Sequence, residues 1–450
     1  MTTHDLIIIG SGSGNSLLTP DYDDWHVALV EDGPLGGTCL NRGCIPSKML
    51  VHTADRARIA ATSDRFGIDT SFAGADWPAI RDRIFGRIDP IAASGEVYRE
   101  QADNVDLFKT HGRFVGHKDL AVDDQVISAD TIVLAAGAHV HVPAIPGLAD
   151  VDFHTSDTIM RADELPARTT IIGGGFVGVE MGHVLAALGS EVTMLVRRAG
   201  LVTDEDPEVS RRITAAYGRR LDLRLGTSLV EVEQRGDEVV VITGDGEVVG
   251  DALLVATGRT PNGRDLGVER TGVELDGEGY VVVDDHGRTT ADGIWALGDI
   301  SSPQQLKHKA NADARLVAHN IVHPEDLRSL DLGPVPHAVF GDPQVASVGM
   351  TEPEARAAGI DCAIVVHDYA STAYGWAMED TSSIVKLLAD RDTHLLVGAH
   401  VIGPQASTLI QQLIQGMRFG QTVEQLARDQ WWIHPALPEV VEQALLAFDW

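Results

Sequence analysis

The chain has 450 residues and a formal net charge of −31, from 66 acidic side chains against 35 lysines and arginines. That length exceeds what one hydrophobic core supports, so we expect about two to four domains. The acidic excess argues against nucleic acid and anionic membranes as partners.

Cysteine and hydropathy patterns set further limits. Three cysteines are too few for a secreted disulfide framework, and they predict a cytoplasmic protein. Cys362 is distant from the other two, and we interpret it as an ordinary buried thiol. No apolar run approaches the length of a signal peptide or a membrane span. No metal site is expected.

The first predicted element is a buried parallel strand that ends in a glycine-rich turn, at 5–14. Such a turn lets the backbone approach a pyrophosphate at the start of the next helix. The second strand, 27–30, is followed by an acidic residue that suits ribose hydroxyls. The pattern predicts a dinucleotide site formed by Gly10, Gly12, Ser13, Gly14 and Glu31.

Two cysteines follow directly, five positions apart in the segment 36–48. A disulfide between Cys39 and Cys44 requires Cα atoms about 4.4–6.8 Å apart, closer than a regular helix holds positions i and i+5. We therefore expect a distorted opening turn of a helix. A helix N-terminus stabilises a thiolate, so the pair indicates redox chemistry.

An amphipathic helix is predicted over 76–100, with Ile80, Ile84, Ile88 and Ile91 on one face and a bend near Pro90. Apolar strands at 133–137 and 254–258 then end in small residues. We interpret these two strands as the points where the chain leaves the first nucleotide domain and later returns.

A complete fingerprint, Gly173, Gly175 and Gly178, lies between a strand and a helix. The next strand, 191–196, is followed by Arg197 and Arg198 instead of an acid. Guanidinium groups at that place suit a 2′-phosphate, so this half is predicted to bind NADPH. The alternative is a solvated pair of surface arginines.

The last third contains no nucleotide signature. A strand at 294–299 ends in Gly298 and Asp299, and the acid is placed to reach the ribityl chain of a flavin. Beyond Pro334 the sequence predicts strands and then a helix at 407–420, which we interpret as an interface domain.

A histidine and a glutamate precede the predicted final helix, 437–446. Glu439 follows His434 by five residues and can orient its ring. Thiol–disulfide exchange needs such a group, because the thiolate attacks and the departing thiolate takes a proton.

The motifs of this chain, and their order along it, resemble those of the flavoprotein disulfide reductases. They are the first fingerprint at 10–14, the CxxxxC segment at 39–44, the second fingerprint at 173–178, the strands at 254–258 and 294–299 and the HPxxxE motif at 434–439. This family includes glutathione reductase, dihydrolipoamide dehydrogenase and mercuric reductase. Within these class I pyridine nucleotide-disulfide oxidoreductases, the mycothione reductases are the most similar group. The stretches that carry this similarity are 10–16, 85–91, 374–381 and 432–442.

The resemblance implies an α/β fold: two Rossmann-like nucleotide-binding domains and a C-terminal α+β dimerisation domain. It places an FAD-binding domain at 1–148 and an NADPH-binding domain at 149–261. A central domain at 262–333 would complete the FAD site, and 334–450 would form the interface of a homodimer.

The resemblance also implies roles for the redox residues. Cys44 would be the flavin-proximal thiol and Cys39 the thiol that attacks substrate. Lys48 would lie near the flavin, paired with Glu180, and Phe176 would cover the flavin as an aromatic gate. Further cofactor contacts implied by the family motifs are Gly37, Thr38, Gly43, Lys48, Phe114, Ala136, Gly137, Glu180 and Gly258.

His434, held by Glu439, would come from the other subunit and complete its active site. The implied reaction passes electrons from NADPH through FAD and the Cys39–Cys44 disulfide to mycothione, regenerating mycothiol for thiol redox homeostasis. NADPH-preferring relatives usually carry a second arginine past the strand, which 201–204 lacks, and Arg198 is the substitute.

Three alternatives follow from the same motifs. A dihydrolipoamide dehydrogenase using NAD would carry an acid in place of Arg197, and a mercuric reductase would end in a cysteine pair. The third is a non-enzymatic, NADPH-responsive flavoprotein, for which retention of Cys39, Cys44 and His434 together would be unusual.

Overall fold

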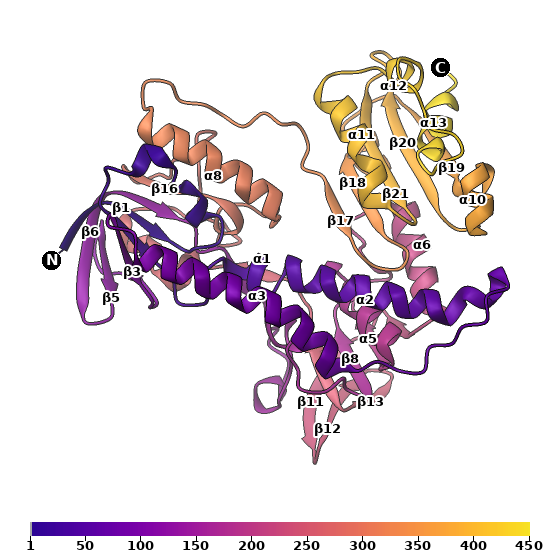
Figure 1. Ribbon diagram of the computed structural model, residues 1–450, viewed down its shortest axis with the longest axis horizontal. Coiled ribbons are helices and arrows are strands. Elements are labelled where there is room, and N and C mark those ends of the chain that lie inside the picture. Colours follow the sequence, from indigo (N-terminus) through magenta and orange to yellow (C-terminus); the bar gives the residue numbers. More distant parts are fainter. Residues whose placement is uncertain (1) are drawn as a thin grey trace.

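The first sheet has seven strands in the computed structural model, which describes residues 2–450 (Figure 1). Its order is β3-β2-β1-β6-β5-β4, with β16 beside β6. β1 runs parallel to both β2 and β6, so Ile9 lies between Val30 and Leu134 and the carboxyl ends of the three strands meet. The strands are β1 (Thr2–Ile9), β2 (Val27–Val30), β3 (Val105–Phe108), β4 (Arg113–Phe114), β5 (Asp119–Val122), β6 (Gln125–Leu134) and β16 (Ile294–Ala296).

The second sheet is parallel, in the order β10-β9-β8-β14, and a three-stranded antiparallel sheet lies beside it. β7 (Ala138–Val140) and β15 (Arg259–Pro261) pair with each other where the chain crosses between the two nucleotide folds. The strands are β8 (Arg168–Ile172), β9 (Glu191–Val196), β10 (Asp222–Leu225), β14 (Ala252–Val255), β11 (Leu229–Arg235), β12 (Glu238–Thr243) and β13 (Gly246–Gly250).

The C-terminal sheet is antiparallel, in the order β17-β18-β21-β20-β19, with helices on one face (Figure 1). Its strands are β17 (His337–Val339), β18 (Val345–Gly349), β19 (Cys362–Asp368), β20 (Ile384–Asp390) and β21 (Leu396–Ile402). Its helices are α9 (Glu352–Ala357), α10 (Ala373–Met378), α11 (Ala406–Arg418), α12 (Val423–Arg428) and α13 (Glu439–Leu446). The expected α/β class with a C-terminal α+β domain is confirmed.

The remaining helices connect the sheets, and α2 packs on α5. They are α1 (Gly37–Asn41), α2 (Cys44–Thr62), α3 (Trp77–Glu100), α4 (Ser156–Ile159), α5 (Phe176–Leu188), α6 (Pro207–Gly218), α7 (Gly263–Leu266) and α8 (Lys307–Val322). None of the described helices is both long and apolar enough to cross a membrane.

Helix α3 begins after Asp76, whose carboxylate accepts a hydrogen bond from the Ala79 amide, and it continues through Pro90. Ile84 and Ile88 are buried as predicted, but Ile91 is 57% exposed. Ile91 still lies on the predicted face, because seven residues place it only about 20° from Ile84 around the helix axis.

One apolar core joins the three main parts of the molecule. It contains Leu50 of α2, Ile84 of α3, Val184 of α5, Val339 of β17 and Ile402 of β21, all buried. The site residues of α2 and α5 therefore stand on rigidly packed helices.

Candidate active site

A cavity of about 720 Å³ runs between the two nucleotide folds. It is lined by the glycine-rich turn after β1, the thiols of α1 and α2, Asp299 and the start of α8. This volume lies in the range of ligand-binding clefts, and several glycines line it.

The turn after β1 leaves bare backbone where a pyrophosphate must approach. A Cβ atom on Gly37 would lie 2.7 Å from the Cα atom of Gly12, so only glycine allows these two segments to meet. The Glu31 carboxylate accepts hydrogen bonds from the Ser11 amide at 2.8 Å, the Ser11 hydroxyl at 2.7 Å and the Gly33 amide at 2.9 Å. These hydrogen bonds fix the Glu31 carboxylate at the cavity wall, where it suits ribose hydroxyls. The glycine-rich turn and this carboxylate together fit the adenosine and pyrophosphate of FAD.

The two thiols stand on either side of a break between helices. α1 carries Cys39 and ends at Asn41, and Cys44 is the first residue of α2. The Asn41 amide nitrogen donates to the carbonyl oxygens of Pro34, Leu35 and Gly37, which holds the preceding loop in place. The predicted distortion is thus a complete interruption of the helix, and both residues are present as thiols that line the cavity.

The break gives the two thiols opposite acidities. The Cys39 thiol donates a hydrogen bond to the Cys44 sulfur, which lowers the pKa of Cys44 to about 7 although burial acts against it. The Lys48 ammonium lowers that pKa further. The pKa of Cys39 is raised above its ordinary value, first by the same hydrogen bond and then by burial. In the reduced pair the proton therefore stays on Cys39 and the negative charge on Cys44.

Lys48 and Glu180 form the predicted ion pair. The Lys48 ammonium lies 2.7 and 2.6 Å from the two oxygens of the Glu180 carboxylate, whose side chain is 8% exposed. The Phe340 amide donates to the same carboxylate at 3.0 Å, and the ammonium lies 4.6 Å from the centre of the Phe340 ring. α2, α5 and the C-terminal sheet thus meet beside the thiols.

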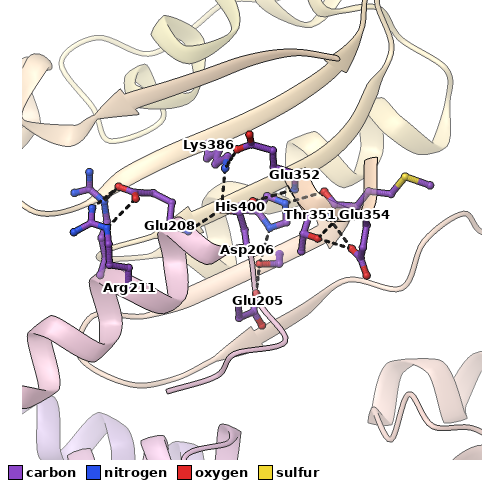
Figure 2. A network of polar contacts seen from close by, with 12 residues as sticks. Glu205, Asp206, Glu208, Arg211, Thr351, Glu352, Glu354, Lys386 and His400 are labelled. Carbon is purple, nitrogen blue, oxygen red and sulfur yellow. Dashed lines mark hydrogen bonds and ion pairs between the residues drawn. The ribbon is translucent and has the colours of Figure 1, made fainter. Parts of the chain in front are cut away.

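Phe176, the predicted gate, lines the cavity at the start of α5. Its ring stacks on His337 with centroids 5.4 Å apart, and the His337 Nε2 atom lies 2.5 Å from the Glu205 carboxylate. Ser347 donates to the other Glu205 oxygen, and His400 contacts Ser347. Figure 2 shows Glu205, Asp206 and His400 in this buried network between α6 and the C-terminal sheet.

The second fingerprint adopts the geometry of a nucleotide site outside this cavity. A Cβ atom on Gly178 would lie 2.4 Å from the Gly173 carbonyl oxygen, and Gly175, the N-cap of α5, has open space in front of it. Arg197 and Arg198 are exposed after β9. The Arg198 guanidinium lies 2.5 Å from the Asp204 carboxylate and 2.6 Å from the Thr203 hydroxyl. Arg197 has no ion-pair partner within residues 2–450.

His434 lies in the loop before α13, and Glu439 is the first residue of that helix. The His434 Nδ1 atom is 3.2 Å from the Glu439 carboxylate, and the His434 side chain is 65% exposed. Glu439 Oε2 is buried without a hydrogen-bond partner among the described residues. Neither residue lines the cavity of its own chain.

The structure brings most of the predicted residues of the first site together. Those that line the cavity are Gly10, Gly12, Ser13, Glu31, Gly37, Thr38, Cys39, Gly43, Cys44, Lys48, Ala136, Gly137, Phe176, Glu180, Gly298 and Asp299. Burial raises the pKa of Asp299 above its ordinary value. Gly173, Gly175, Gly178, Arg197, Arg198 and Gly258 lie at the second fold and do not line it.

Two residues predicted for the first nucleotide site do not line the cavity either. Phe114 is fully buried in the core of the first sheet, while the neighbouring His111 and Gly112 line the cavity instead. Gly14 packs against Ala135, where a Cβ atom would lie only 2.9 Å from the alanine methyl. Phe114 therefore does not line the cavity, because its side chain is buried in the core.

Sequence reasoning missed several residues of the site. Lys307, at the first turn of α8, lines the cavity, donates to the Ser13 hydroxyl at 2.9 Å and lowers the pKa of Cys39. Arg259 and Asn262 also line it and donate to the backbone carbonyls of Ala138 and Ala136. The sequence offers one signal for Lys307, because this residue begins the helix that follows the predicted strand ending in Gly298 and Asp299.

Comparison with known proteins assigns nearly the whole chain to one protein family. The family signature "Pyridine nucleotide-disulphide oxidoreductase" matches residues 4–314, and its dimerisation domain matches residues 335–445. Mycothione reductase of Mycobacterium tuberculosis is 47% identical, with 99% of each chain covered. Mercuric reductase of Staphylococcus aureus is 31% identical over 99% of this chain and 82% of its own.

The fold also matches a solved structure. The HOCl-induced flavoprotein disulfide reductase RclA from Escherichia coli superimposes with a TM-score of 0.88 at 29% identity. The match covers 99% of this chain and 100% of that one.

Proposed function

The chain belongs to the pyridine nucleotide-disulphide oxidoreductase family, and from this we propose that its substrate is mycothione and its electron donor NADPH. It is a flavoprotein disulfide reductase whose cofactors are FAD and a pyridine nucleotide. The observation that carries the choice of substrate is 47% identity to a mycothione reductase over 99% of both chains. The reaction would regenerate mycothiol, in a cytosol where thiols stay reduced.

The chemistry that bound NADPH and FAD supply is transfer of an electron pair, which opens the Cys39–Cys44 disulfide. We assign Glu31, Gly12 and Gly37 to hold FAD. We assign Lys48, held by Glu180, to position the flavin ring. The acidities of the thiols support this division: Cys44 keeps the negative charge beside Lys48, and Cys39 keeps the proton until substrate arrives.

The substrate half of the reaction is thiol–disulfide exchange. His434 of the partner subunit takes the proton of Cys39, whose thiolate attacks one sulfur of mycothione and forms a mixed disulfide. The departing mycothiol thiolate takes that proton back from His434. The Cys44 thiolate then attacks the Cys39 sulfur, which restores the Cys39–Cys44 disulfide and releases the second mycothiol as a thiolate that takes its proton from solvent. Two electrons and two protons are consumed in total.

The dimerisation domain supports a homodimer, and the exposed His434 supports its action in the partner's site. Trp431 is 99% exposed and Ile433 is 75% exposed in the single chain, so this segment is suited to contact a second copy. We propose the domain boundaries 1–148, 149–261, 262–333 and 334–450. Separate sheets support the first, second and last, and β16 of 262–333 joins the first sheet, which suits a segment that completes the FAD site.

The preference for NADPH is assigned to Arg197. Asp204 and Thr203 hold Arg198, whereas Arg197 is exposed after β9 and available for a 2′-phosphate. Arg197→Ala should raise KM for NADPH by about tenfold, the loss of one charge-assisted hydrogen bond, and leave KM for NADH unchanged. Equal changes with both nucleotides would contradict this assignment.

The substrate is tested by following nucleotide oxidation by the FAD-loaded dimer. Mycothione, glutathione disulfide and lipoamide are compared at equal concentrations, with NADH run beside NADPH. We expect rapid turnover with mycothione and NADPH and little with the other pairs. Preference for lipoamide and NADH would overturn both assignments and leave the dithiol chemistry in place.

A further inference from the structure

Two histidines and an aspartate converge at one end of the first sheet, away from the cavity. His4 lies in β1, His26 directly precedes β2, and Asp106 lies in β3, the next strand of the same sheet. The Nε2 atoms of His4 and His26 each lie 3.0 Å from the same oxygen, Oδ2 of Asp106. None of the three lines the cavity, and the reaction described above does not use them.

The spacing of these three atoms is that of ligands around a small cation. Zinc is held at about 2.0–2.2 Å by imidazole nitrogen and carboxylate oxygen, so neighbouring ligand atoms of a tetrahedral ion are about 3.3–3.5 Å apart. The two nitrogen–oxygen distances of 3.0 Å are close to this value. All three atoms lie within 4.8 Å of one another.

The cluster is fixed on one side and open on the other. The His4 side chain is fully buried, and its ring packs edge-on against Phe108. Its Nδ1 atom has no partner among the described residues, so the ring's polar contact is made through Nε2 alone. The side chains of His26 and Asp106 are 45% and 49% exposed. Water or a small anion can therefore complete the coordination from solvent.

We propose that His4, His26 and Asp106 bind one divalent transition-metal ion of the zinc class, in a site separate from the redox centre. Two imidazoles and one carboxylate suit Zn²⁺ better than Mg²⁺ or Ca²⁺, which prefer oxygen ligands. The ion replaces the protons that the two rings share with Asp106 and links β1, β2 and β3 through three side chains. The sequence shows no metal motif because the ligands are brought together by strand order, from positions 4, 26 and 106.

Zn²⁺ binding to the full-length, FAD-loaded protein tests the proposal, with any affinity tag removed. The thiols of the redox pair also bind zinc, so the measurement uses a background in which Cys39→Ser and Cys44→Ser are both present. Isothermal titration with zinc chloride should give one ion per chain. His26→Ala should weaken that binding by at least about tenfold, since a direct ligand is lost.

His394→Ala is the matched control, because His394 also pairs with one carboxylate, Glu424, at 2.7 Å but has no second histidine. It should bind Zn²⁺ as tightly as the background protein does. Circular dichroism verifies that His26→Ala is folded, as expected for a half-exposed side chain at the end of a loop. Equal affinity in the background protein and His26→Ala, or no binding in either, would overturn the proposal.

Discussion

At the scale of single residues, the chemistry depends on an asymmetry between two identical side chains. Cys44 starts α2 beside Lys48 and accepts a hydrogen bond from Cys39, so its pKa falls to about 7 while that of Cys39 rises. The spacing of the cysteines predicts the redox pair. It does not predict which thiol is acidic, because that depends on the break at Arg42 and Gly43 and on Lys48 being held by Glu180.

This asymmetry predicts different effects of two substitutions at Cys39. Cys39→Ser keeps a hydroxyl donor toward Cys44, whereas Cys39→Ala removes the largest cause of the lowered pKa. The Cys44 thiolate forms as pH rises through its pKa, so alkylation of Cys44 should reach half its maximal rate near pH 7 in Cys39→Ser. In Cys39→Ala the midpoint should move upward by about one unit, the worth of one such hydrogen bond. Mass spectrometry of the Cys44 peptide measures the rate, and identical midpoints would contradict the account.

At the scale of elements, the start of α6 is anchored to the C-terminal sheet by buried charges. Asp206 caps α6 through the Glu208 amide, and it lies 2.9 Å from the Lys386 ammonium of β20 (Figure 2). Lys386 also lies 2.7 Å from Glu352. The strands 27–30 and 191–196 are predicted correctly because buried parallel strands are mostly apolar along their length. The anchor is not predictable from local pattern, because its charges are up to 180 residues apart in the chain.

Removal of this anchor should destabilise the protein. Lys386→Met leaves Asp206, which is fully buried, without its cation and should cost about 3 kcal/mol of unfolding free energy. The matched control is Arg235→Met, whose pair with Glu247 is exposed, so its loss should leave the free energy of unfolding almost unchanged. Urea unfolding followed by circular dichroism measures the loss of unfolding free energy in both variants. Equal losses would show that the buried ion pair stabilises the protein no more than an exposed one.

The anchor also predicts a dependence on pH. Burial raises the pKa of Asp206, but the hydrogen bonds from Lys386 and from backbone amides outweigh it and leave the pKa below its ordinary value. Stability contributed by Asp206 is therefore complete above the carboxyl's ordinary pKa of about 4 and is lost as pH falls below it. The difference in stability between wild type and Lys386→Met should shrink on acidification below that pH. A difference that stays constant would contradict the assignment.

At the scale of the whole molecule, the two halves of the proposed chemistry lie apart in one chain. The thiols line the cavity between the nucleotide folds, whereas His434, in the loop before α13, does not. The order of motifs predicts the fold class and the cavity residues. It does not show which surfaces meet in a dimer, because exposed apolar residues such as Ile91 and Trp431 carry no periodic signal of their partner.

A shared active site predicts complementation between two inactive variants. A heterodimer of Cys39→Ser with His434→Ala would contain one intact site, formed by Cys39 of one chain and His434 of the other. A mixture assembled at random, half of which is heterodimer, should therefore regain about a quarter of wild-type activity, and isolated heterodimers about half. The measurement uses two purification tags to isolate heterodimers. Absence of activity in them would place His434 and Cys39 of the same chain in one site.

The central claim is that Cys39 and Cys44 carry the electrons from nucleotide to substrate, and a thiol count tests it most directly. The FAD-loaded protein is denatured anaerobically before and after addition of NADPH, and its thiols are counted. Of the three cysteines, only Cys362 should react in the oxidised protein, all three after NADPH, and only Cys362 again after mycothione is added. A count that does not change with NADPH would contradict the account.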